Sequence, residues 1–195
     1  MNFLRSIYDK MLKWSAGKNA VYYLFAVAFI ESSFFPIPPD IMLIPMVLAN
    51  KNDAWKIAGI ATIGSVLGGF FGYAIGMFCF DAIAKPIIDF YNLMHQFEEL
   101  RSYYLKYGSW IVLFAGITPF PYKIITIASG LVQLNFAVFT VASIISRGLR
   151  FYIIAGLLYK FGTPIKSFIE KHFGILSLLL FAALVAGFYV IKFIK

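Results

Sequence analysis

Five charged residues lie in otherwise apolar stretches of the chain, where each charge needs a partner. They are Glu31, Asp40, Lys123, Arg147 and Arg150. In the apolar run 136–159, 11 residues precede Arg147 and 9 follow Arg150, so both arginines fall near its middle. Each would cost on the order of 3 kcal/mol at the centre of a bilayer. Because they are three residues apart, they share one helix face and could bind a common ligand.

The three cations outnumber the two carboxylates by one charge, which an anionic ligand would balance. Arginine matches phosphate through its planar fork, and lysine supplies a point charge. We therefore predict a site for a phosphate-bearing lipid headgroup, formed by Lys123, Arg147 and Arg150. Glu31 and Asp40 would neutralise the empty site, and proton exchange by these carboxylates is a further hypothesis. In the alternative interpretation, the arginines pair with Glu31 and Asp40 only to assemble the fold.

No histidine, the commonest acid–base residue of enzymes, lies inside any of the apolar stretches. A lipid phosphatase or phosphotransferase would need a histidine or serine nucleophile beside acids in the membrane plane. The two histidines, His95 and His172, lie in charged parts of the chain instead. The single cysteine, Cys79, allows neither an intramolecular disulfide nor a CxxC pair. We therefore expect no enzyme activity, no cofactor and no bound metal.

The composition indicates an integral membrane protein. Of the 195 residues, 61% are hydrophobic and 13% are charged, against roughly 25% charged in soluble domains. An ordinary soluble protein is therefore excluded. The 17 basic and 9 acidic residues give a net charge of +8, which in a hydrophobic chain favours cytoplasmic loops and anionic lipids over nucleic acid. No linker divides the chain, so we expect one membrane domain over 1–195.

The predicted fold class is an all-α polytopic membrane protein with about three full transmembrane helices. The spans are expected at 57–80, 136–160 and 174–194, since each apolar run is long enough to cross a bilayer. Amphipathic helices lying on the membrane are expected at 1–19 and 86–106. The first span carries a ladder of glycines that should let another helix approach closely. The ladder comprises Gly64, Gly68, Gly72 and Gly76.

Two further apolar segments, 20–50 and 108–133, are interrupted by prolines and are predicted to be re-entrant hairpins. Proline removes a helix donor and restricts the residue before it, so neither segment can form one continuous helix. The legs 21–30 and 41–49 are each about 15 Å long as helix, roughly half a membrane. The prolines expected at the hairpin tips are Pro36, Pro38, Pro39, Pro119 and Pro121.

The two broken segments resemble each other and indicate an internal duplication. P-I-P-P-D at 36–40 has the same form as P-F-P-Y-K at 119–123, and each is followed by a short apolar leg, a polar turn and a long span. Paired broken segments in corresponding halves are typical of transporter binding sites. The opposite charges of Asp40 and Lys123 would suit two hairpins that meet at one site. Two merely kinked helices with surface charges are the alternative.

Three motifs together resemble the DedA family, the bacterial branch of the VTT or SNARE-associated Golgi protein group. They are ESSFFPIPPD at 31–40, GSVLGGFFGYAIG at 64–76, and FAGITPFPYKIITIASG at 114–130 followed by SRGLRF at 146–151. The resemblance covers roughly 22–162 and favours a subgroup written TPxPYK. It implies two inverted re-entrant hairpins and a multi-pass protein of the bacterial plasma membrane. The family is associated with moving polyprenyl phosphates and phospholipids and with envelope integrity.

The resemblance also assigns roles to individual residues. Glu31 and Asp40 fall on the two acidic positions of the first family motif, which are implicated in proton dependence. Lys123 falls on the second basic position of the second motif, whereas Ile117 occupies the first. Arg147 and Arg150 would then replace the missing charge.

The expected function is flippase-type or scramblase-type translocation of a lipid such as undecaprenyl phosphate or a phospholipid. Two alternatives remain: a proton- or cation-coupled exporter of small ions, and a structural factor for envelope integrity that transports nothing. The expected partners are membrane lipids with phosphate headgroups. A homo-oligomer is left open, and a nucleic-acid partner is not expected.

Overall fold

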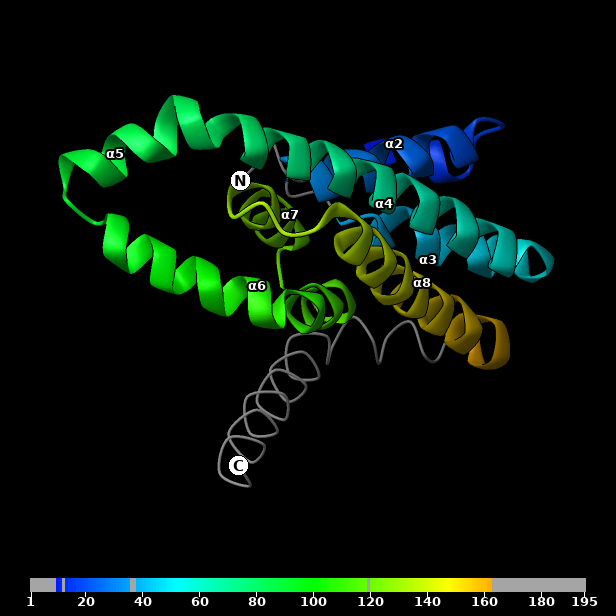
Figure 1. The fold of residues 1–195 in the computed structure, drawn as a ribbon. Coiled ribbons are helices and arrows are strands. Elements are labelled where there is room, and N and C mark those ends of the chain that lie inside the picture. Colours follow the sequence, from blue (N-terminus) through cyan, green and yellow to red (C-terminus); the bar gives the residue numbers. More distant parts are fainter. Residues whose placement is uncertain (1–9, 12, 36–37, 119, 163–195) are drawn as a thin grey trace, which may run out of the picture.

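The computed structural model describes residues 10–11, 13–35, 38–118 and 120–162, and within them the fold is entirely helical (Figure 1). The helices are α2 (Ala20–Ser33), α3 (Asp40–Ala49), α4 (Ala54–Cys79), α5 (Lys85–Phe90), α6 (Met94–Ile117), α7 (Tyr122–Leu131) and α8 (Phe136–Phe161). A 3-10 turn at Lys51–Asp53 precedes α4, and a π turn at Phe80–Ala84 joins α4 to α5. The all-α prediction is confirmed for this part of the chain.

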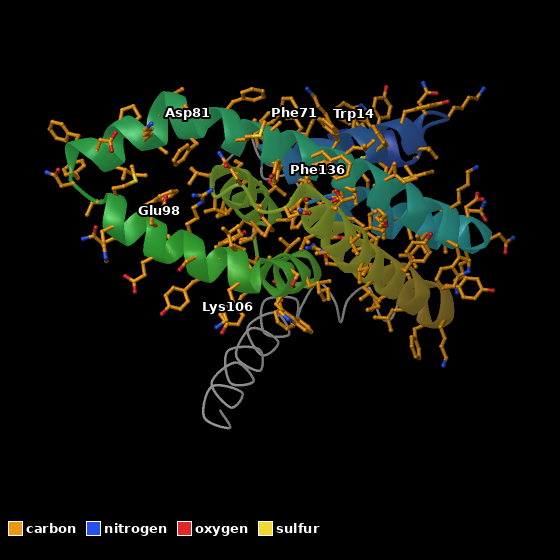
Figure 2. All side chains as sticks on the ribbon, in the orientation of Figure 1. Trp14, Phe71, Asp81, Glu98, Lys106 and Phe136 are labelled. Atoms are coloured by element: carbon orange, nitrogen blue, oxygen red, sulfur yellow. The ribbon has the colours of Figure 1, made fainter. Side chains whose placement is uncertain are left out.

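Among the residues that the structure describes, two helices are long and apolar enough to cross a membrane. They are the stretch Lys51–Phe90, which contains α4, and α8, while α2, α3 and α7 are shorter apolar helices. Large apolar side chains such as Phe71 and Phe136 are exposed on the outside of these helices, where lipid would cover them (Figure 2). The fold therefore agrees with a helical membrane protein. The third predicted span, 174–194, and most of 1–19 lie outside the described residues.

Proline interrupts both predicted hairpin segments. Helix α2 ends at Ser33 and α3 begins at Asp40, directly after Pro39; α6 ends at Ile117 and α7 begins directly after Pro121. Proline suits a helix start because its missing N–H would have no partner there. Both segments thus have the predicted helix–break–helix form. That each turns back inside the bilayer stays a prediction.

The helix lengths support the predicted duplication. Helices α3 and α7 each have 10 residues, and the long helices α4 and α8 that follow them each have 26. Matching the helix starts pairs Asp40 with Tyr122, so Lys123 lies one position later than the motif comparison suggests. The same matching pairs Ser65 with Arg147, because each is the twelfth residue of its helix.

The two long helices run antiparallel, as an inverted repeat requires. Trp55 near the start of α4 packs against Tyr159 near the end of α8, with ring centroids 6.0 Å apart. Phe136, the first residue of α8, packs against Tyr73 in the second half of α4, with centroids 5.3 Å apart. The two halves also interlock, since α7 packs on α4 and α3 packs on α8. Each short helix therefore contacts the long helix of the other half.

The predicted amphipathic helix at 86–106 is wrong as a single element. Helix α5 ends at Phe90, and a turn containing Asn92 with a φ of 55° separates it from α6. Asparagine tolerates this left-handed conformation better than most residues, which explains the break. Helix α6 then continues without interruption into the first leg of the second hairpin. That leg is therefore part of a 24-residue helix, not a short helix of its own.

The glycine ladder packs helices closely, as its spacing predicts. Gly64 and Gly68 lie against α2, where a Cβ added to Gly64 would sit 2.6 Å from the carbonyl oxygen of Phe25. Gly72 and Gly76 lie against α7, where a Cβ on Gly76 would overlap the carbonyl oxygen of Ile127. The ladder therefore lets α4 pack closely on α2, the first leg of the first broken segment, and on α7, the second leg of the second broken segment.

Candidate functional site

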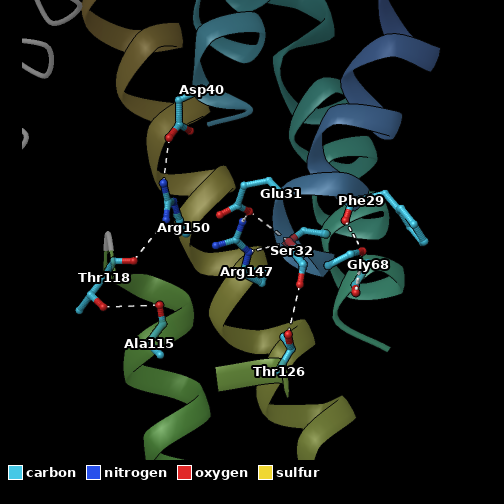
Figure 3. Close-up of polar contacts among 12 residues, drawn as sticks. Phe29, Glu31, Ser32, Asp40, Gly68, Ala115, Thr118, Thr126, Arg147 and Arg150 are labelled. Atoms are coloured by element: carbon cyan, nitrogen blue, oxygen red, sulfur yellow. Dashed lines mark hydrogen bonds and ion pairs between the residues drawn. The ribbon is translucent and has the colours of Figure 1, made fainter. Parts of the chain in front are cut away.

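The predicted buried charges meet where the two broken segments approach α8. Glu31 lies in the last turn of α2, and Asp40 is the first residue of α3, so the two acids flank the first break. Arg147 and Arg150 lie one turn apart in the middle of α8. Figure 3 shows both arginines on the side of α8 that faces these acids. The two arginines share a face, as their spacing predicts.

Arg147 is completely buried and is held on several sides. Its Nη2 donates to Oε2 of Glu31 at 2.9 Å, and its Nε donates to Oγ of Ser65 at 2.6 Å. The guanidinium carbon lies 4.8 Å from the ring centroid of Tyr122 and 4.9 Å from that of Phe151. Aromatic faces attract a cation, so these rings help to compensate the buried charge.

Buried hydroxyl groups extend the polar network around Arg147. Ser32 Oγ shares a hydrogen bond of 2.6 Å with Ser65 Oγ and donates to Glu31 Oε2 at 3.1 Å. Thr126 on α7 donates to the backbone carbonyl of Ser32 at 3.2 Å, which ties the second broken segment to the first. Tyr122 donates its hydroxyl proton to Ser143. The network therefore joins α2, α4, α7 and α8.

Arg150 contacts both broken segments at once. Its Nη2 donates to Oδ2 of Asp40 at 2.8 Å, and its Nη1 donates to the backbone carbonyl of Thr118 at 3.2 Å (Figure 3). Thr118 directly follows the last residue of α6, where helix carbonyls lack helical partners. Arg150 thus links the start of α3 to the end of α6.

Two atoms of this cluster remain buried without a hydrogen-bond partner: Nη1 of Arg147 and Oδ1 of Asp40. Leaving a buried polar group unsatisfied costs on the order of 1–3 kcal/mol, and more when the group is charged. One is a donor and the other an acceptor. These two atoms are the unused hydrogen-bonding positions of the cluster.

The structure brings four of the five predicted charged residues together. Lys123 lies in the first turn of α7 and is half-buried, and the ion pairs among the described residues do not include it. Pro39 and Pro121 cap α3 and α7, while Pro38 is exposed. Pro36 and Pro119 lie outside the described residues.

Several polar and aromatic members of the cluster were missed by the sequence interpretation. Ser65 follows Gly64 within the glycine ladder, and nothing in its position along the sequence indicates a contact with α8. Tyr122 stands inside the second proline motif, where only the adjacent lysine was considered. The helix matching described above pairs Ser65 with Arg147, but it needs the helix starts that only the structure gives.

Comparison with known proteins places the chain in a family. A family model described as the VTT domain matches residues 37–160, a range that contains Asp40, Arg147 and Arg150. The chain belongs to the VTT domain family, also called the DedA family. The match to the family model begins after Glu31, so this acid lies outside the matched part of the VTT protein.

The relatives of this VTT protein span most of its length. It is 34% identical to an uncharacterized protein of Haemophilus influenzae over 98% of its own chain and 100% of that protein. It is 37% identical to an uncharacterized protein of Histophilus somni, over 80% of its own chain and 82% of the other. An uncharacterized membrane protein of Mycobacterium leprae is 24% identical over 84% and 77% of the two chains. No solved structure matches the VTT protein.

Proposed function

We propose that this VTT protein moves phosphate-headed lipids across the bacterial plasma membrane, and that the arginine cluster binds the headgroup. The observation that carries the proposal is the fully buried Arg147, whose Nη1 has no partner, between two proline-broken segments. A cation at this depth is rare and usually functional in a membrane protein. A phosphate oxygen is the acceptor that an arginine edge binds best.

The ion pairs would let the site alternate between empty and occupied states. In the empty state, Glu31 and Asp40 neutralise Arg147 and Arg150. An arriving phosphate competes with the carboxylates for the same guanidinium groups. Protonation of one carboxyl would then release its arginine to the ligand, which is how proton coupling would operate.

Lys123 and the short helices would complete the phosphate site. Helices α3 and α7 each begin at a proline-broken segment, and their first N–H groups attract anions. Lys123 lies in that first turn of α7, and in this proposal it adds the third positive charge when the ligand is bound. The lipid tails would remain in the bilayer against the exposed apolar side chains of α4 and α8.

A structural role without transport is the second candidate, because Glu31 pairs with Arg147 and Asp40 pairs with Arg150 in this structure. Such pairs can hold α8 against the first broken segment and do nothing more. The ion-exporter alternative is less well supported by the geometry. One oxygen of each carboxylate is occupied by an arginine, which leaves a poor cation site.

Reconstitution into proteoliposomes separates these candidates. Acyl-labelled phospholipids in the inner leaflet become accessible to an impermeant quencher if the protein moves lipids. We expect the wild-type protein to give faster quenching than protein-free vesicles. Arg147→Lys should give slower quenching than the wild type, because lysine keeps the charge but lacks the planar guanidinium fork. Arg101→Lys makes the same change on α6, away from the cluster, and should retain the activity. No acceleration with the folded wild-type protein would leave the structural candidate, and ion flux without lipid movement would favour the exporter.

A further inference from the structure

Three exposed lysines lie at the end of the molecule where α4 begins and α8 ends. Figure 1 shows these two helix ends at one end of the molecule and α5 at the other. Lys51 lies in the 3-10 turn before α4, Lys56 in the first turn of α4, and Lys160 in the last turn of α8. The ammonium group of Lys51 reaches the end of α8, 3.3 Å from the position of a Cβ added to Gly162. Both long helices therefore contribute positive charge to this end.

The charges of these lysines are not compensated by acids. The ion pairs among the described residues do not include them. The acid closest to Lys51 and Lys56 along the chain is Asp53, and its Oδ2 already accepts a hydrogen bond from Nδ2 of Asn50 at 2.6 Å. Nζ of Lys160 lies 5.5 Å from the ring centroid of its neighbour in the chain, Phe161, a contact that carries no negative charge. Since like charges repel each other, an anionic partner would stabilise this end.

Two exposed aromatic rings connect α4 and α8 beside the lysines. Trp55 precedes Lys56 and Tyr159 precedes Lys160, and the two ring centroids are 6.0 Å apart. Tryptophan and tyrosine are enriched where the apolar core of a membrane meets the lipid headgroups. We call Lys51, Lys56, Lys160, Trp55 and Tyr159 the lysine surface.

The depth of the lysine surface follows from its distance to the arginine cluster along α8. Arg150 lies near the middle of α8, and Lys160 follows it by ten residues. This separation is about 15 Å of helix, or half the thickness of a bilayer's hydrocarbon core. Exposed apolar side chains lie between the two levels, among them Ile153 on α8 and Ile63 on α4. The protein surface thus changes from apolar to aromatic to basic, in the order of acyl chains, interface and headgroups in a lipid leaflet.

The opposite end of the molecule lacks this excess of positive charge. The π turn, α5 and α6 carry four acids and three bases besides His95: Asp81, Asp89, Glu98, Glu99, Lys85, Arg101 and Lys106. Residues 50–56 and 159–162, by contrast, contain three lysines and a single acid. An attraction for anionic lipids therefore belongs to the end with the lysine surface.

We propose that the lysine surface binds the headgroups of anionic phospholipids in the leaflet beside it. The lysines attract the net negative charge of the headgroup, as basic clusters next to transmembrane helices do. The rings of Trp55 and Tyr159 pack against the interfacial part of the lipid, and the acyl chains continue along the exposed apolar side chains. A zwitterionic headgroup has no net charge for the lysines to attract. This binding site is separate from the arginine cluster and does not depend on the proposed transport.

Quenching of Trp55 fluorescence by brominated lipids tests this binding. Trp14→Phe with Trp110→Phe leaves Trp55 as the single tryptophan. This protein is reconstituted into phosphatidylcholine bilayers that contain brominated phosphatidylglycerol, which is anionic, or brominated phosphatidylcholine. We expect the anionic lipid to be preferred beside Trp55 by about tenfold or more, since one lysine near an anionic surface already contributes a factor of about five. Equal quenching by the two lipids would overturn the proposal and leave the lysines to water or to an acidic protein.

Paired lysine variants locate the preference. Lys56→Gln with Lys160→Gln should lower it by at least about fivefold, the factor expected of one lysine. Lys85→Gln with Lys106→Gln removes the same two charges at the other end of the molecule. Its effect should be less than about twofold, because charges beyond a Debye length are screened. An equal loss in both double variants would contradict a local site.

A salt titration of the single-tryptophan protein keeps the inference testable if the lysine variants do not fold. The Debye length falls from about 10 Å at 0.1 M salt to about 3 Å at 1 M, so the preference for phosphatidylglycerol should decrease. A preference that is unchanged at 1 M salt would overturn recognition by charge. Because these measurements follow binding and not movement, their failure leaves the proposed transport standing, and a protein that moves no lipid can still show the preference.

Discussion

Glu31 and Arg147 form an ion pair. Among the described residues, neither side chain forms an ion pair with any other residue. Removing one partner leaves the other charge buried and uncompensated, which costs about 3–5 kcal/mol in comparable buried pairs. We therefore expect Glu31→Gln to lower the free energy of unfolding by about 3 kcal/mol. Denaturation in mixed detergent micelles measures this change. Removing both charges in Glu31→Gln with Arg147→Met should cost less than the sum of the two single changes.

Glu98→Gln is the matched control for this stability effect. Glu98 pairs with Arg101 at 3.4 Å, but both side chains are substantially exposed. Exposed pairs contribute about 0–1 kcal/mol. A loss at Glu98 as large as that at Glu31 would show that burial does not distinguish the two pairs.

Tyr122 acts on Arg147 through its ring and on Ser143 through its hydroxyl. Tyr122→Phe keeps the ring over the guanidinium, whereas Tyr122→Leu removes it. We expect lipid movement to fall about tenfold or more in the leucine variant and less than threefold in the phenylalanine variant, since a desolvated cation–π contact contributes about 2 kcal/mol. The quenching assay measures both rates. Equal losses in the two variants would assign the effect to the hydroxyl instead.

The charged residues of the cluster could be predicted from the sequence because a charge within an apolar run is conspicuous. Their hydroxyl and aromatic neighbours could not, because serine and tyrosine are ordinary in membrane helices and only the helix packing selects Ser65 and Tyr122. Lys123 was predicted with the arginines from its charge and from its place in the second proline motif. Its place one residue after the start of α7 depends on where that helix begins, which the proline motif fixes only to within a residue.

At the scale of whole helices, the glycines of α4 determine how closely α2 and α7 pack against it. Gly76→Ala would drive a methyl group into the carbonyl of Ile127, and α7 would have to move. Overpacking typically costs 1–3 kcal/mol and sometimes more, so we expect a loss of about 3 kcal/mol in unfolding free energy. Unfolding in mixed micelles measures the loss.

Gly148→Ala is the control on the other long helix. The nearest atom to its added Cβ is Cγ2 of Thr62, 3.9 Å away, so the methyl group fits. Alanine is favoured over glycine inside a helix by about 0.5–1 kcal/mol. A gain or no change is therefore expected at Gly148, and a loss equal to that at Gly76 would contradict the packing argument.

Element boundaries show where sequence reasoning succeeds and where it stops. The long helices and both proline breaks follow from apolar length and from the covalent limits of proline. The division at Asn92 does not, since a single asparagine does not by itself end a helix and only the chain path requires a positive φ there. The extension of α6 into the second broken segment was missed because a change from amphipathic to apolar residues does not itself end a helix.

The whole molecule should have its two halves inverted across the membrane. Because α4 and α8 run antiparallel, the turn before α4 and the turn before α8 should lie on opposite sides. Single cysteines at Asn52 and Gln133, both exposed, test this in a Cys79→Ser background. An impermeant maleimide should label one in intact cells and the other only after permeabilisation. Labelling of both from the same side would contradict the inversion.

The contact between Ser65 and Arg147 has a consequence for how such a molecule could arise. These residues occupy matching positions in the two halves, and they touch each other. In a dimer of identical half-length chains, the same residue type would meet itself at this contact. Two arginines would repel each other, and two serines would carry no charge. A chain that contains both copies escapes this restriction, so fusion of an ancestral pair would have allowed one half to specialise as donor and the other as acceptor.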